Sequence, residues 1–100
     1  MRFNFETAKR GKCLIEVAPD DGDTLATIWH GPDRNHQATT FARATTTLPD
    51  FYEEASPGDR AELLARLVIH HFEAFGGFPG RDDLETELSH TWDGQISPVP

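Results

Sequence analysis

Polar and apolar residues alternate over much of the first 43 residues, and period-two alternation predicts half-buried β-strands. Four stretches carry this signal or are rich in β-branched and aromatic residues: 1–6, 12–17, 24–30 and 37–43. Asp21 and Gly22 form the clearest turn between two of them, since an Asp-Gly pair tolerates hairpin geometry. No helical stretch separates the strands, so we expect an antiparallel meander of three to four strands.

A different period begins at residue 57. Mostly apolar side chains then recur at the spacing of one helical face. The residues of this face are Leu64, Leu67, Val68, His71, Phe72 and Phe75. Ser56 can cap this helix, Pro57 suits its first position, and Asp59 stands where a capping box has its acid. Gly76 then favours a helix end. The pattern predicts one long amphipathic helix over residues 57–75.

Two shorter elements are predicted around this helix. Residues 48–54 are typical of a short helical turn, which Phe51 and Tyr52 would pin to the core. Residues 82–90 predict a second, C-terminal helix, because Asp82 can cap it and Leu84 and Leu88 form an apolar stripe.

The predicted fold class is therefore α+β, with the meander packed on the long helix and a short second helix near the C-terminus. We expect residues 1–93 to form a single domain. Residues 94–100 contain two prolines, and we expect them to form a loose tail.

The chain is acidic, with 9 Lys and Arg, 17 Asp and Glu, and a net charge of −8. This balance disfavours direct binding to nucleic acid or to an anionic membrane and favours a basic partner. Without an apolar run of membrane-spanning length or a signal-peptide pattern, we expect a cytoplasmic location. Cys13 is the single cysteine, and its place on an apolar strand face indicates a core residue rather than a nucleophile.

The histidines are the strongest candidates for reactive chemistry. His70 and His71 are adjacent on the predicted helix and point about 100° apart, whereas helical metal sites use an i,i+4 pair. His71 lies in the apolar stripe, which favours a structural role. His90 or His30 could come near in space, but sequence alone does not show it. We therefore expect no catalytic residue, metal or cofactor.

Two groups of residues are candidates for partner binding. Acids concentrate at the predicted helix starts and would form a negative patch if they shared a face: Asp50, Glu53, Glu54, Asp59, Asp82, Asp83, Glu85 and Glu87. Phe75 and Phe78 flank flexible glycines and are predicted either to form an exposed aromatic loop for a partner or to fold back on the core.

These features favour a non-enzymatic protein-binding or inhibitor protein whose acidic surface engages a basic, nucleic-acid-handling partner. In size and acidity the chain resembles small phage-encoded inhibitors, including anti-CRISPR and anti-restriction proteins, some of which would act as DNA mimics. Toxin-immunity proteins share this profile. The resemblance is one of class, carries no shared motif and assigns no residue role. Two alternatives are a small metal-dependent enzyme using His70, His90 and nearby carboxylates, and a subunit of a larger assembly with Leu14 and Phe78 at its interface. The oligomeric state stays open.

Overall fold

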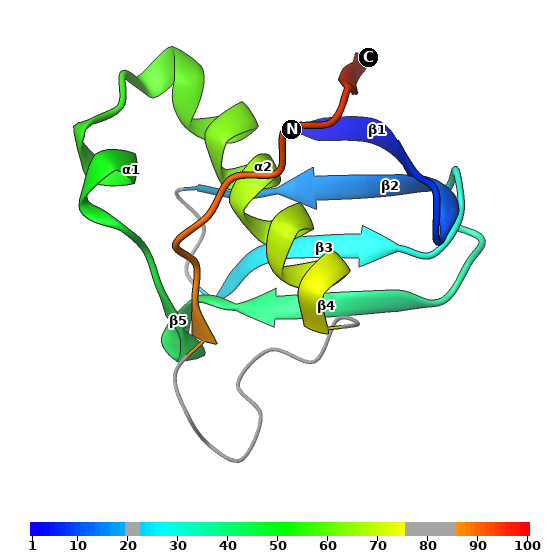
Figure 1. Cartoon of the computed structure of the whole chain (residues 1–100), viewed down its shortest axis with the longest axis horizontal. Helices are drawn as coiled ribbons and strands as arrows, with labels where there is room; N and C mark the ends of the chain where they lie inside the picture. Colours follow the sequence, from blue (N-terminus) through cyan, green and yellow to red (C-terminus); the bar gives the residue numbers. More distant parts are fainter. Residues whose placement is uncertain (20–22, 76–85) are drawn as a thin grey trace.

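The computed structural model describes residues 1–19, 23–75 and 86–100. Its main sheet has five antiparallel strands in the order β4-β3-β2-β1-β7 (Figure 1). Their bounds are Arg2–Thr7 for β1, Gly11–Val17 for β2, Thr24–Trp29 for β3, Ala38–Ala42 for β4 and Ile96–Val99 for β7. The predicted meander of three to four strands and the α+β class are confirmed: the meander has four strands, and a fifth strand is added beside β1.

The alternation along the strands decides which side chains enter the core. In the register of β1 with β2, Phe3 lies opposite Ile15 and Phe5 opposite Cys13, and all four are buried. Successive strand residues point to opposite faces, so these side chains share one face. Gly11 begins β2 with a φ of 74°, a left-handed conformation that glycine adopts without steric cost.

Helix α2 spans Pro57–Phe75, the predicted bounds, and crosses one face of the sheet (Figure 1). The Ser56 hydroxyl donates to the Asp59 carboxylate over 2.8 Å, and the Asp59 amide donates to the Ser56 carbonyl over 3.0 Å. Five large apolar side chains of α2 are fully buried, which contributes roughly 8–15 kcal/mol before the entropy of ordering is subtracted. These are Leu64, Leu67, Val68, Ile69 and Phe72.

A short helix, α1, spans Asp50–Glu54 and lies beside α2 (Figure 1). Tyr52 anchors it with only 4% of its surface exposed, as predicted. Phe51 is 44% exposed, so the prediction that it also pins α1 to the core was wrong. Neighbouring residues on a helix point about 100° apart, and a helix this short can turn only one of them inward.

The region after the long helix differs most from the sequence predictions. Thr86–Glu87 forms strand β6, which pairs in parallel with β5, Thr46–Thr47. The 3₁₀ helix η1, Arg43–Thr45, immediately precedes β5. The C-terminal helix predicted over 82–90 is therefore wrong for 86–90, and residues 82–85 lie outside the described residues. Leu88 still reaches the core, but from an extended segment whose amide donates to the Thr47 carbonyl over 3.1 Å.

The predicted loose tail is wrong for residues 96–99, which form β7. Ile96 pairs with Phe5 and Val99 with Arg2, so this strand closes one edge of the sheet. Pro98 is tolerated because an edge strand needs hydrogen bonds on one side only. The tail is held by pairing with a distant strand, which local composition does not reveal.

The sheet face away from α2 carries a small cluster of its own. Leu14 is only 4% exposed and lies opposite Asn4 and Trp29 in the two neighbouring strands. The Arg34 guanidinium stacks 5.5 Å from the Trp29 ring and bonds to a neighbouring carboxylate. Leu14 is therefore buried within the chain, and its expected role as an exposed interface residue was wrong. None of the described helices is long and apolar enough to cross a membrane.

Candidate functional site

A cavity of about 360 Å³ lies between the C-terminal half of α2 and the segment that follows β6. Its walls combine apolar side chains with three imidazoles, a hydroxyl and a carboxylate. They are formed by Leu67, His70, His71, Ala74, Phe75, Glu87, Leu88, Ser89 and His90. Its volume lies at the lower end of the range of small-molecule pockets.

His70 and His90 face each other in this cavity. Their ring centroids lie 5.2 Å apart, and the ring planes are inclined by 27°. The Ser89 hydroxyl lies 3.0 Å from Nδ1 of His90 and hydrogen-bonds to it. The sequence places these two histidines twenty positions apart and could not show that they meet. His30 does not line the cavity and instead bonds to Thr39 over 2.8 Å.

His71 has a different environment, although it also lines the cavity. Its ring packs edge-on against Phe41, with centroids 6.0 Å apart, and against Phe75 at 4.7 Å. Its Nε2 atom is buried without a hydrogen bond to any described residue. Burial lowers the pKa of His71, and the neighbouring His70 lowers it further. His71 is therefore a neutral packing residue, in line with the structural role that the helical pattern favoured.

The cavity does not contain a completed metal centre. Among residues 1–19, 23–75 and 86–100, no three His, Cys, Asp or Glu side chains are placed to hold one ion together. The histidine pair can supply two nitrogen ligands, and neutral imidazoles suit zinc, copper and nickel.

The described members of the predicted acidic patch lie on three elements, α1, α2 and β6. Asp50, Glu53 and Glu54 are exposed on α1, and Asp59 is exposed in the first turn of α2. Glu87 is exposed in β6, where it pairs with Thr47 just before α1 begins. Asp82, Asp83 and Glu85 lie outside the described residues.

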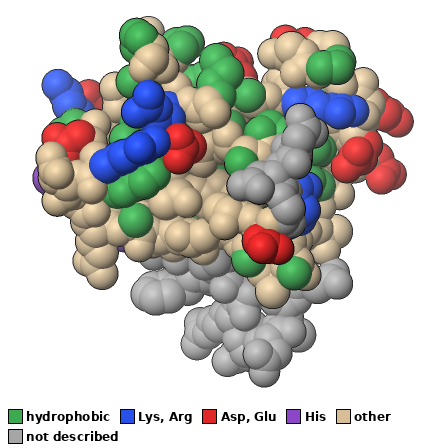
Figure 2. Space-filling view, turned by 180° about the vertical axis from the view of Figure 1, so that it is seen from behind, with side chains coloured by type: hydrophobic (Ala, Val, Ile, Leu, Met, Phe, Trp, Pro, Cys, Tyr) green, Lys and Arg blue, Asp and Glu red, His purple; other side chains and the backbone are tan. Residues whose placement is uncertain are grey.

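The acids of α1 have no cationic partner among the described residues, a property they share with Glu6, Asp23, Asp59, Glu87 and Asp93. Ion pairs within the described part of the chain join Arg10 to Glu73, Arg34 to Glu16, Arg66 to Glu62 and His36 to Asp33. None of them involves an acid of α1. Arg60 is close by, but it donates to the Glu53 carbonyl over 2.8 Å rather than to a carboxylate. Asp and Glu side chains project into solvent at the edge of the molecule that carries α1 (Figure 2).

Of the two aromatic residues predicted to bind a partner, only Phe75 is among the described residues. Phe75 is 63% exposed at the end of α2, where it borders the histidine cavity. Phe78 lies outside the described residues. The exposed Phe51 was missed as a surface residue, because the sequence pattern assigned it to the core with Tyr52.

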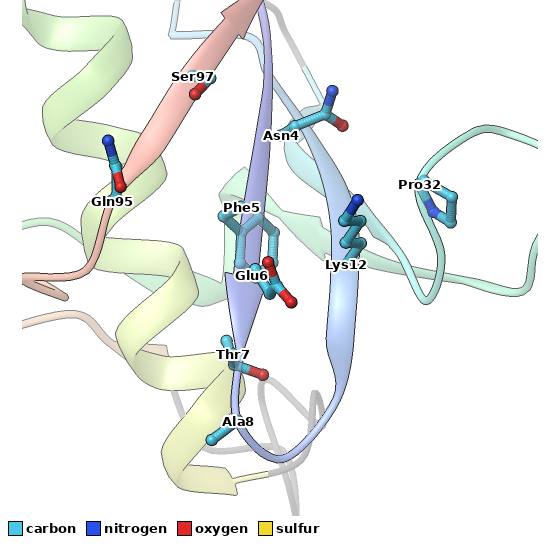
Figure 3. A pocket seen from close by; sticks show the side chains of 9 residues that line it. All are labelled: Asn4, Phe5, Glu6, Thr7, Ala8, Lys12, Pro32, Gln95 and Ser97. Carbon is cyan, nitrogen blue, oxygen red and sulfur yellow. The ribbon is translucent and has the colours of Figure 1, made fainter.

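A larger groove of about 760 Å³ runs along β1 and reaches β7 and Pro32 (Figure 3). Its polar side chains include Asn4, Gln95 and Ser97, together with one carboxylate from Glu6 and one ammonium from Lys12. Glu6 and Lys12 are paired across the strands. This balanced mixture of charges and amides shows neither an acid–base pair nor a metal-ligand set.

Cys13 is fully buried in the sheet and is not a nucleophile candidate. Burial raises its pKa, and the nearby Glu73 carboxylate raises it further, against a smaller opposing effect of Arg10. A thiol that resists ionisation is a poor nucleophile.

Comparison with protein-family models, curated proteins and solved structures found no match to this chain.

Proposed function

We propose that this chain is a non-catalytic protein-binding domain whose acidic surface at α1 engages a basic partner. The observation that carries the proposal is the composition of α1: one helix of five residues carries three exposed acids without an ion pair to a described residue and one exposed aromatic ring. These residues are Asp50, Phe51, Glu53 and Glu54. We name them the α1 surface.

The charge of the chain supports a basic partner. Its net charge is −8, and the described arginines are largely engaged with backbone carbonyls or with carboxylates away from α1. Unpaired surface acids repel one another and attract cations, so a complementary basic surface gains both affinity and association rate. Proteins that hold nucleic acid present such surfaces, because duplex DNA carries about one charge per 1.7 Å. The proposed action is inhibition by occupying that surface.

Phe51 supports a protein partner rather than a small cation. Aromatic anchors contribute much of the binding energy in protein interfaces, where they fill pockets and surrounding polar residues exclude water. Phe51 is held in place because Tyr52, the next residue, is buried and Arg60 lies over the Tyr52 ring with its Cζ 5.9 Å from the centroid. The α1 surface is therefore presented on an anchored helix.

The test compares two double charge reversals in affinity capture from host lysate with quantitative mass spectrometry. Glu53→Lys/Glu54→Lys changes the α1 surface, and Glu6→Lys/Asp93→Lys makes the same change of charge at exposed positions elsewhere. We expect the first variant to lose a basic protein that the wild type and the second variant retain. Added salt should weaken that capture, since screening acts on exposed charges. Equal retention by both double variants would refute the α1 surface as the binding site.

Phe51→Ala separates the anchor from the charges. Because Phe51 is 44% exposed, its removal should lower the free energy of unfolding by about 1–1.5 kcal/mol, roughly half the cost for a fully buried side chain. The same variant should weaken binding of the captured partner by at least about tenfold, which is 1.4 kcal/mol. Unchanged affinity would remove Phe51 from the interface.

A further inference from the structure

We propose that His70 and His90 form a binding site for a divalent transition-metal ion, with Zn²⁺ as the ion to test. The inference is independent of the α1 surface. The two histidines come from different elements, the C-terminal half of α2 and the segment after β6, and they line one cavity. Their meeting is a product of the fold and not of local sequence.

The spacing of the rings suits one shared ion. A zinc–nitrogen bond is about 2.1 Å long, so two imidazoles on one tetrahedral ion have ring centroids about 5 Å apart. The centroids of His70 and His90 lie 5.2 Å apart. The two rings are stacked with their planes inclined by 27°, so binding of one ion requires rotation of the side chains until one nitrogen of each faces the same point.

A hydrogen bond from Ser89 occupies one ring nitrogen of His90 and leaves the other for an ion. The Ser89 hydroxyl hydrogen-bonds to Nδ1 of His90 over 3.0 Å, which leaves Nε2 as the nitrogen available to an ion. Metal-binding histidines are commonly held by such a bond on the other ring nitrogen, which orients the ring and selects the tautomer. His70 makes no hydrogen bond to a described residue through either nitrogen, so both are available.

The ligands beyond the two imidazoles decide which metal ions the site favours. Glu87 is exposed and lines the same cavity, but it is not placed with the two imidazoles as a third ligand, so water would fill the remaining positions. His71 does not contribute Nε2, which is buried. Two imidazoles with water favour zinc, nickel or copper over magnesium or calcium, which prefer oxygen ligands. The site is open and exchangeable rather than a closed structural centre.

A bound ion would join two parts of the chain. His90 belongs to the segment that leads from β6 to β7, and His70 belongs to α2. An ion that binds only the folded state stabilises that state by RT ln(1 + L/Kd), where L is the concentration of free ion. Zn²⁺ should therefore raise the melting temperature, and Mg²⁺ should not.

The test is calorimetric titration of Zn²⁺ into protein that carries no histidine tag. We expect one ion per chain. His70→Gln and His90→Gln should each lower the affinity by at least about tenfold. His36→Gln is the matched control, since His36 is an exposed histidine outside the cavity, and it should leave the affinity unchanged.

Two results would overturn the proposal. One is the absence of Zn²⁺ binding by the wild type at millimolar ion, and the other is an equal loss of affinity in the His90→Gln and His36→Gln variants. Because His90 is exposed, its replacement removes no core contact, and circular dichroism of each variant checks that the fold is retained. Histidine ring resonances in NMR spectra provide a second readout, since only those of His70 and His90 should shift at the first equivalent of Zn²⁺.

Discussion

Arg66 holds the C-terminal segment against α2, and its replacement by methionine tests how that segment is attached. Its Nη1 donates to the Trp92 carbonyl over 2.9 Å and to the Gly94 carbonyl over 2.7 Å. The Arg66 carbonyl in turn accepts from the Trp92 amide over 2.9 Å. Methionine keeps the apolar stem and the backbone contact but removes both charged hydrogen bonds.

The magnitude follows from those two bonds. A hydrogen bond from a charged donor contributes about 1.5–3 kcal/mol, and the lower end applies here because the Arg66 side chain is 26% exposed and the freed carbonyls can regain water. The expected loss is roughly 2–3 kcal/mol in the free energy of unfolding. For a domain of this size that corresponds to a fall of roughly 10–20 °C in melting temperature.

The assay combines urea denaturation with hydrogen exchange. Glu62→Gln is the control, since it removes the ion pair between Arg66 and Glu62 and leaves the carbonyl contacts of Arg66 intact. The two charged groups of this pair lie 3.5 Å apart, and the Glu62 side chain is 56% exposed. Such an exposed pair contributes at most about 1 kcal/mol. Hydrogen exchange should accelerate in β7 and at the Trp92 amide more than in the central strands. If Arg66→Met costs no more stability than Glu62→Gln, the segment is held by other contacts and the reasoning is wrong.

Two further predictions concern the partly buried His71 and the buried Cys13. Burial lowers the pKa of His71, so the unfolded chain takes up this proton from about pH 6.5 downward while the folded chain does so only at lower pH. Stability should therefore fall with acidification below about pH 6.5, and His71→Phe should reduce the loss of melting temperature between about pH 7 and pH 5. The buried thiol of Cys13, whose pKa is raised, should react with iodoacetamide in the folded protein only at the rate of unfolding.

Each of these predictions has a clear contrary result. An identical pH dependence in His71→Phe and the wild type would show that His71 does not resist protonation in the folded state. Alkylation of Cys13 in the native protein as fast as in urea would show that the β2 core face opens without unfolding. Tryptophan fluorescence recorded during alkylation shows whether Cys13 reacts in the folded or the unfolded protein, because Trp29 pairs with β2 and reports on its environment.

The sequence predicted best where structure depends on near neighbours. The bounds of α2 follow from an apolar period, a capping serine and a terminal glycine, all within a few positions of the helix ends. The first four strands likewise follow from alternation and turn residues.

The prediction was weakest after residue 75, where distant partners decide the outcome. Residues 86–87 have a weak local preference, and pairing with β5 makes them a strand. The tail becomes β7 because β1 offers an open edge. The same limit applies to the candidate site: the sequence identified His70 and His90 separately, but only packing brings their rings to 5.2 Å. Phe51 and Tyr52 were indistinguishable by type, and the orientation of α1 separates them.

The pairing of β7 with β1 also has a consequence for folding kinetics. It joins Arg2 to Val99, almost the whole length of the chain, whereas the β1–β2 hairpin joins residues only 4–14 positions apart. Closing a loop about ten times longer costs about 2 kcal/mol more in chain entropy. The edge strand should therefore join after the rate-limiting step, so that substitutions in Ile96–Val99 accelerate unfolding and leave the folding rate almost unchanged.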